Sequence, residues 1–329
     1  MKYNINLSFK NLTKLSIGII ISLFIIFSLY SRLDLNQLKI AIRDTNPNYL
    51  IVGLLITFFI GLISSFRFTF FSRKFGILPC PNIITSFKSY FVVSCFNLIL
   101  PSKLGDLSKG FICERLDKRK YPNSIHIFTF YEKISDLFAI ISIFLLFSIC
   151  LNTKDTNSLS NLIEKNLIFQ IRFIYFFLII FFILFIFLSP SFKYILRKFK
   201  KINKKSRFRE FINFYSNLSI IYFINYQLFS IMLWIIQILQ MLIFGLAVGI
   251  NLFSVYGVMV LIVSTLVGLL PISFAGIGTR DATLLFLLSS RFDNPNILIL
   301  GFLLSTRYLV PSLIGLYYSR NLSNYAFKG

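Results

Sequence analysis

Eight ionisable side chains lie within or next to the apolar stretches of this sequence and are the strongest candidates for a functional site. An Arg or Asp at the centre of a membrane helix costs about 2.5–3.5 kcal/mol on insertion scales. Such residues pair with one another or line a pathway for a substrate. The eight are Asp106, Lys109, Glu132, Lys133, Asp136, Arg280, Asp281 and Arg307.

Two of these carboxylates, Glu132 and Asp136, are four residues apart and therefore share one face of a helix. Two carboxylates on one face repel each other unless a cation or a proton separates them. The available cations are Lys109, Arg280 and Arg307. These groups either form a site for a charged ligand or make buried ion pairs that only fix helix packing.

The stretch LLPISFAGIGTRD, at 269–281, places a proline, two glycines and two charges between apolar runs. Irregular backbone at membrane depth is tolerated only where it is buried in protein or lines a wet cavity. Gly276 and Gly278, near a helix start, would leave backbone N–H groups free beside Arg280, which suits an anion such as phosphate. Alternatively, the glycines only allow close helix packing. No P-loop lysine follows, so nucleotide binding is not predicted.

No arrangement typical of an enzyme or a metal site is recognisable. The four cysteines form no CxxC pair and no metal-ligand spacing, and His126 is the only histidine. No nucleophile lies beside an oriented base in any known pattern. We therefore predict no catalytic residue, no metal and no cofactor.

The elements that position these residues are membrane helices. Of the 329 residues, 56% are hydrophobic and 14% charged, which is more apolar side chain than a soluble core of this size could hide. The net charge of +22 could suggest nucleic acid. However, the basic residues lie between apolar runs, where they set topology and contact anionic lipid. We predict a membrane protein with no nucleic-acid partner.

Hydropathy and the distribution of Lys and Arg predict an all-α protein with six spans and two re-entrant hairpins. The second span is expected to end at the cytoplasmic surface with Arg67. No small-residue cleavage site follows the first apolar run, so we interpret it as an uncleaved span, with both chain termini in the cytoplasm. The spans are 15–30, 49–66, 127–151, 167–188, 226–250 and 296–318, and the hairpins are 86–110 and 255–290.

The predicted spans divide into two halves, about 10–151 and 166–320, each reading span, span, hairpin, span. Three crossings in each half give the halves opposite orientations. Leu-Pro-Ser-x-x-Gly at 100–105 and Leu-Pro-x-Ser-x-x-Gly at 270–276 occupy corresponding places. We therefore predict an inverted repeat, as in many secondary transporters. It lies within a single integral membrane domain, 1–329, and no soluble domain is expected.

These motifs give the chain its resemblance to a known family. It resembles the membrane domain of bacterial lysylphosphatidylglycerol synthetases/flippases and the free-standing membrane proteins built from that domain. Asp106 and Asp281 replace the family's usual Glu, and Lys133 its usual Arg, which keeps the charge but changes the reach. The matching motifs are Leu100-Pro101, Gly105-Asp106, Glu132-Lys133 with Asp136, Pro271 through Gly276, Gly278, Arg280-Asp281 and Arg307.

The resemblance implies translocation of a lipid across a bacterial cytoplasmic (inner) membrane. Larger members add a soluble aminoacyl-transferase domain, which is not expected here, so aminoacylation is not implied. Some relatives are fused or adjacent to glycosyltransferases, so a polyprenyl phosphate or glycolipid joins anionic phospholipid as an expected substrate. The alternatives are a membrane transferase acting on a lipid-linked sugar, with Asp106 or Glu132 as base, and a non-catalytic partner of a separate glycosyltransferase.

On this interpretation the headgroup binds between the two hairpin tips, held by Arg280, Arg307 and backbone N–H groups. When the site is empty, we expect these two arginines to pair with carboxylates, so that headgroup binding competes with internal salt bridges. The predicted site residues are Asp106, Lys109, Glu132, Asp136, Gly276, Gly278, Arg280, Asp281 and Arg307.

Overall fold

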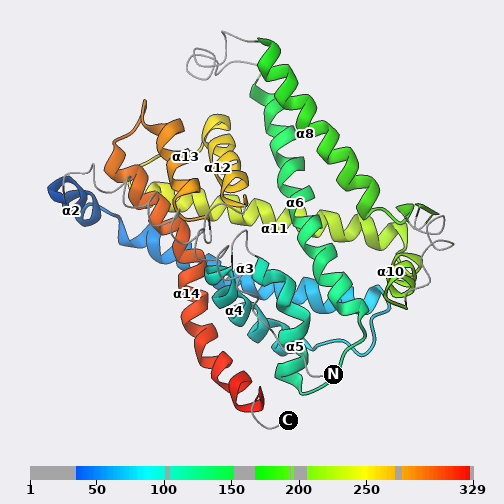
Figure 1. Ribbon diagram of the computed structural model, residues 1–329. Helices are drawn as coiled ribbons and strands as arrows, with labels where there is room; N and C mark the ends of the chain where they lie inside the picture. Colours follow the sequence, from blue (N-terminus) through cyan, green and yellow to red (C-terminus); the bar gives the residue numbers. More distant parts are fainter. Residues whose placement is uncertain are drawn as a thin grey trace, which may run out of the picture.

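The computed structural model describes residues 35–100, 104–151, 167–192, 194–195, 206–270 and 276–326. Every regular element in these ranges is a helix, which confirms the predicted all-α class (Figure 1). Several predicted features lie outside the described residues. They are the first span at 15–30, residues 101–103 of the first hairpin, the loop at 152–166, most of the basic stretch between 193 and 209, and residues 271–275 of the second hairpin.

The described helices carry the numbering of Figure 1. In chain order they are α2 (Leu35–Arg43), α3 (Pro47–Lys74), α4 (Ile83–Ile99), the short 3-10 helix η1 (Leu104–Ser108), α5 (Lys109–Asp117), α6 (Ser124–Leu151), α8 (Leu167–Leu188), α10 (Ser206–Ser216), α11 (Ile220–Ala247), α12 (Val255–Gly268), α13 (Thr279–Leu288) and α14 (Asn294–Ala326). Polar N-caps fix several helix starts: the side chains of Asn46, Asn82, Ser219 and Ser254 each accept a backbone N–H at the start of α3, α4, α11 and α12.

Within the described ranges, three helices are long and apolar enough to cross a membrane: α3, α11 and the Asn294–Arg320 part of α14. Shorter apolar segments are Ile83–Leu98, Tyr175–Leu188 and Val255–Gly268. Helix α6 has the same length as α3 but contains Glu132, Lys133 and Asp136. The protein is therefore a multi-pass membrane protein. The count of six spans and the depth of the two hairpins stay predictions.

Helix α3 is longer than the predicted span 49–66, whose limits in the membrane stay a prediction. Helix α3 continues without interruption past residue 66 to Lys74, and Arg67 is one of its most buried side chains. The prediction assumed that an arginine after an apolar run lies at the membrane surface. Arg67 is buried among the helices of the protein, where two carboxylates neutralise it.

The helix contacts recur between the two halves of the chain. Helices α3 and α11 pack against each other. The contact between α4 and α14 corresponds to the contact between α12 and α6. In the same way, the contact between α6 and α11 corresponds to the contact between α14 and α3. If α3, α4, α5 and α6 are matched in order with α11, α12, α13 and α14, each of these contacts has its counterpart. Such exchanged contacts are what the predicted repeat requires.

Small residues let the central helices approach closely. A Cβ on Gly315 of α14 would lie 2.1 Å from the carbonyl oxygen of Phe91 in α4. A Cβ on Gly53 of α3 would lie 2.4 Å from the Phe244 ring of α11. These glycines set the spacing of four of the helices that surround the site.

Candidate functional site

A cavity of about 740 Å³ lies at the centre of the described helices. Its wall is formed by α3, α4, η1, α5, α6, α8, α11, α12 and α14, so it depends on both halves of the chain. Much of the wall is apolar, including Phe176, Phe177 and Ile180 of α8 and Leu266 and Leu270 at the end of α12. The volume falls in the range of about 300–1,000 Å³ that is usual for ligand pockets.

Charged side chains gather on one part of this wall. Asp106, Lys109, Glu132, Asp136 and Arg307, five of the predicted site residues, all line the cavity. Gly276, Gly278, Arg280 and Asp281, the other four, are not among its lining residues. The structure thus brings the predicted residues of the first hairpin, α6 and α14 together and leaves those of the second hairpin apart.

Arg67 joins the two carboxylates of α6. Its Nη2 donates to Glu132 Oε1 at 2.9 Å and its Nη1 to Asp136 Oδ1 at 2.7 Å. Nη1 also donates to the hydroxyl of Ser230 in α11 at 2.9 Å. Glu132 and Asp136 therefore share a helix face and a cation, as their spacing predicted. The expectation that Arg280 or Arg307 would supply this cation was wrong, because α3 packs against α11 and brings Arg67 to this face of α6.

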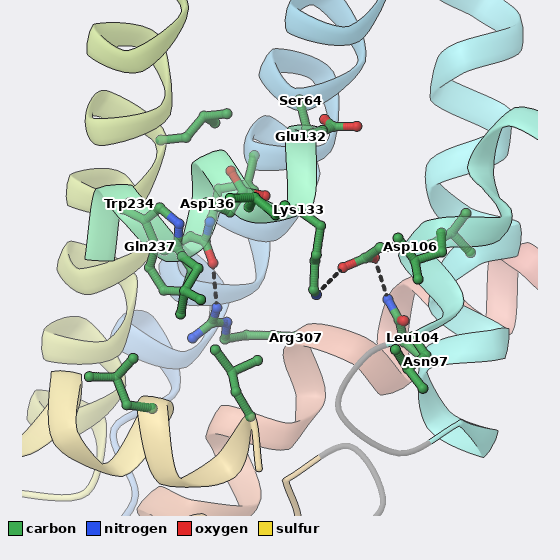
Figure 2. Close-up of a pocket in the computed structure, with 18 of the residues that line it drawn as sticks. Ser64, Asn97, Leu104, Asp106, Glu132, Lys133, Asp136, Trp234, Gln237 and Arg307 are labelled. Carbon is green, nitrogen blue, oxygen red and sulfur yellow. Dashed lines mark hydrogen bonds and ion pairs between the residues drawn. The ribbon is translucent and has the colours of Figure 1, made fainter. Parts of the chain in front are cut away.

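Two lysines complete the network. Lys109 Nζ lies 3.1 Å from both carboxylate oxygens of Glu132, so this carboxylate is held by two cations. On the other side of the cavity, Lys133 Nζ donates to Asp106 Oδ2 at 2.6 Å, and Asn97 Nδ2 donates to Asp106 Oδ1 at 2.7 Å (Figure 2). Lys133 thus pairs α6 with the first hairpin.

Arg307 of α14 has a different kind of partner. Its Nη2 donates to the neutral amide oxygen of Gln237 at 2.8 Å (Figure 2). Within the described part of the chain it forms no ion pair. Next to Gln237 on α11, the indole Nε1 of Trp234 is buried and has no hydrogen-bond partner among the described residues. This corner of the cavity therefore holds donors that no carboxylate occupies.

Arg280 is buried in a contact between α13 and α14. Its Nη2 donates to Asp281 Oδ1 at 3.0 Å, and to the carbonyl of Gly301 and the hydroxyl of Ser305, both at 2.7 Å. The backbone N–H of Gly278, which the sequence suggested would be free for an anion, donates to Asp281 Oδ2 at 3.1 Å. These groups already have partners inside the protein.

Gly276 and Gly278 allow the tight backbone turn that precedes α13. Gly276 and Gly278 both have positive φ, +75° and +94°, which favours residues without a Cβ. A Cβ on Gly276 would lie 2.8 Å from the carbonyl oxygen of Gly268. The glycine–arginine stretch therefore packs α13 closely against α12 and α14, which favours the packing interpretation of these glycines.

We predict that Arg280→Lys destabilises the protein without changing the charges of the cavity. Lysine keeps the positive charge but has a single nitrogen, so it cannot bond to Asp281, Gly301 and Ser305 in the geometry of a guanidinium. Leaving buried acceptors unpaired should lower the free energy of unfolding by about 1–3 kcal/mol. Thermal unfolding of the purified protein in detergent would measure this. The exposed Arg291, changed to Lys, is the control, and equal stability of the two variants would contradict the prediction.

Sequence reasoning missed Arg67, Gln237 and Trp234. Arg67 was placed at the membrane surface by its position after an apolar run. Gln237 lies within the predicted span 226–250. A polar amide inside an apolar span predicts a polar partner on a neighbouring helix. Trp234 is the single tryptophan of the chain and gave no signal by spacing.

Comparison with known proteins gives one match. The family model described as the lysylphosphatidylglycerol synthase TM region matches residues 15–315. No curated protein and no solved structure matches the chain.

Proposed function

The chain belongs to the family of the lysylphosphatidylglycerol synthase TM region, a membrane family related to lipid handling, and from this premise we propose that it translocates a lipid between leaflets. The proposed substrate is an anionic phospholipid or a polyprenyl-phosphate or glycolipid. Its headgroup binds in the central cavity. The proposed location is the bacterial inner membrane, with both termini in the cytoplasm.

The observation that carries this proposal is the division of the cavity wall into a charged part and an apolar part. The charged part comprises α6, the first hairpin and Arg307, whereas α8 and the end of α12 contribute apolar side chains. A lipid has the same division between headgroup and chains. Phe176 and Leu270 line the cavity and are also largely exposed, so acyl chains leaving beside them would stay in an apolar environment.

Arg307 is the proposed headgroup anchor. It lines the cavity, is buried, and has a neutral partner in Gln237 rather than a carboxylate. A guanidinium presents a planar fork of N–H donors that matches two phosphate oxygens. Binding of a phosphate would therefore not require an ion pair of Arg307 to break.

Arg280, Gly276, Gly278 and Asp281 have a positioning part in the proposal instead of the headgroup contact that the sequence suggested. Arg280 bonds to Gly301 and Ser305 of α14, and Arg307 lies on the same helix shortly after them. The second hairpin thereby fixes the helix that carries the anchor. The exchanged contacts between the two halves fit a repeat, and we propose that its halves are inverted, which would present the cavity to either side of the membrane.

The two alternatives have less support. A transferase would need Asp106 or Glu132 as base, but Asp106 accepts from Lys133 and Asn97, and Glu132 from Arg67 and Lys109. To act as a base, either carboxylate would first have to leave these partners. No observation points to a glycosyltransferase as a partner.

Reconstitution into liposomes tests the proposal. Vesicles carrying the purified protein and a fluorescent phosphatidylglycerol should lose outer-leaflet label to the inner leaflet faster than protein-free vesicles, as measured by quenching with dithionite. Mass spectrometry should find the lipid chemically unchanged. Folded protein that leaves the rate at the protein-free level would overturn translocation, and a modified lipid would favour the transferase.

A further inference from the structure

We propose that the cavity selects a headgroup with a single negative charge, a phosphodiester, over a headgroup that bears a diphosphate. This inference rests on the proposed function and names the substrate class of the same site. It separates two of the substrates left open above, because phospholipid headgroups are phosphodiesters, whereas many lipid-linked sugars are diphosphates.

The inference starts from the charges of the described residues that line the cavity. Positive charges exceed negative charges by one. The cations are Arg67, Lys109, Lys133 and Arg307, and the carboxylates are Asp106, Glu132 and Asp136.

The pairing shows where the excess lies. Arg67 and Lys109 are matched by Glu132 and Asp136, and Lys133 is matched by Asp106. Arg307 is the remaining cation of the described lining, and its hydrogen-bond partner there is an uncharged amide. One bound monoanion at Arg307 therefore leaves the described cavity wall neutral.

Among the described residues of the cavity wall, a second negative charge finds no cation of its own. To obtain one, it would have to displace Asp106 from Lys133 or Asp136 from Arg67. Both carboxylates remain partly exposed at the cavity, with 36% and 30% of their side-chain surface accessible. They would repel a dianion at short range and in a poorly screening environment.

The neutral donor beside Arg307 suits the same class of ligand. The Trp234 indole is buried, lines the cavity, and its Nε1–H has no partner among the described residues. A phosphodiester has two non-bridging oxygens that share its single negative charge, and such an oxygen can accept from a neutral indole as well as from a guanidinium. Trp234 can therefore donate a further hydrogen bond to the headgroup without adding a positive charge to the cavity wall.

Binding of lipids that share one tail tests the charge rule. The probes are dioleoyl phosphatidylmethanol, a monoanionic phosphodiester, dioleoylglycerol pyrophosphate, a diphosphate, and uncharged dioleoylglycerol, each titrated against detergent-purified protein by native mass spectrometry. The protein should bind the phosphodiester at least about tenfold more tightly than the pyrophosphate. A preference for the pyrophosphate would overturn the inference.

A charge substitution supplies the sharper comparison. Asp106→Asn raises the excess from one positive charge to two, and should shift the affinity ratio toward the pyrophosphate by about tenfold. Asp136→Asn makes the same change at a second position, in case the first variant does not fold. Asp44→Asn, the same substitution at an exposed site outside the cavity, should leave the ratio unchanged.

The outcomes separate this inference from the proposed function. An unchanged ratio in a folded Asp106→Asn or Asp136→Asn variant would overturn the charge rule while lipid binding stands. If the unsubstituted protein binds neither charged lipid better than dioleoylglycerol, the proposed function itself is wrong.

Discussion

Changing Arg307 to Gln should abolish most lipid movement while the protein stays folded. The guanidinium is the proposed anchor for the headgroup, and glutamine removes its charge. Hydrogen bonds to charged groups contribute about 1.5–3 kcal/mol, so translocation should fall by about 10- to 100-fold in the dithionite assay. Because the described partner of Arg307 is the amide of Gln237, the substitution leaves no buried carboxylate unpaired, and stability should change little.

Two comparisons make this result specific. Arg307→Lys keeps the charge but loses the planar fork, so it should retain part of the transport. The exposed Arg43, which does not line the cavity, loses one positive charge when changed to Gln, and this variant should behave like the unsubstituted protein. Full transport by Arg307→Gln would refute the anchor.

Changing Arg67 to Met should have the largest effect on stability. Arg67 is 2% exposed and bridges Glu132 and Asp136. Without it, Glu132 keeps Lys109, while Asp136 loses the one ion pair that the described residues give it. Removing one partner of a buried ion pair costs about 3–5 kcal/mol. The midpoint of thermal unfolding in detergent should fall strongly, or the variant should aggregate during purification.

A compensated variant distinguishes lost charge pairing from lost packing. If Asp136→Asn is added to Arg67→Met, the uncompensated carboxylate disappears while Glu132 keeps Lys109, and much of the stability should return. Arg73→Met, at an exposed position of the same helix, is the matched control and should unfold like the unsubstituted protein. A midpoint for Arg67→Met equal to that of the control would show that the bridge contributes little.

The two arginines that face the cavity from α3 and α14 thus have different expected consequences. Arg67 forms ion pairs with two carboxylates, so its loss is expected to lower the stability of the fold. Arg307 is bonded to a neutral amide, so its loss is expected to weaken binding of the headgroup. Residue type cannot make this distinction. It depends on which side chains the neighbouring helices present.

The second hairpin shows where an interpretation from sequence alone reaches its limit. Glycines beside an arginine at a helix start are typical of an anion site, and also of a tight hairpin. The positive φ angles of Gly276 and Gly278 are the kind of conformation that such a sequence predicts. Asp281, Gly301 and Ser305 accept hydrogen bonds from the Gly278 N–H and from Arg280 Nη2, which favours the tight hairpin. Two of these residues lie on another helix.

The amino-acid sequence by itself determined that the protein is an all-helical, multi-pass membrane protein of a recognisable family. It also identified six of the seven charged residues in the described cavity wall, because an ionisable group in an apolar run is too costly to be there without a partner or a function. Only the tertiary structure decided which charges pair. Arg67 and Asp136 are 69 residues apart, and the packing of α3, α6 and α11 brings them within 2.7 Å. The cost of a buried charge is a property of the residue and its local hydropathy, whereas the partner that offsets it depends on how distant helices pack.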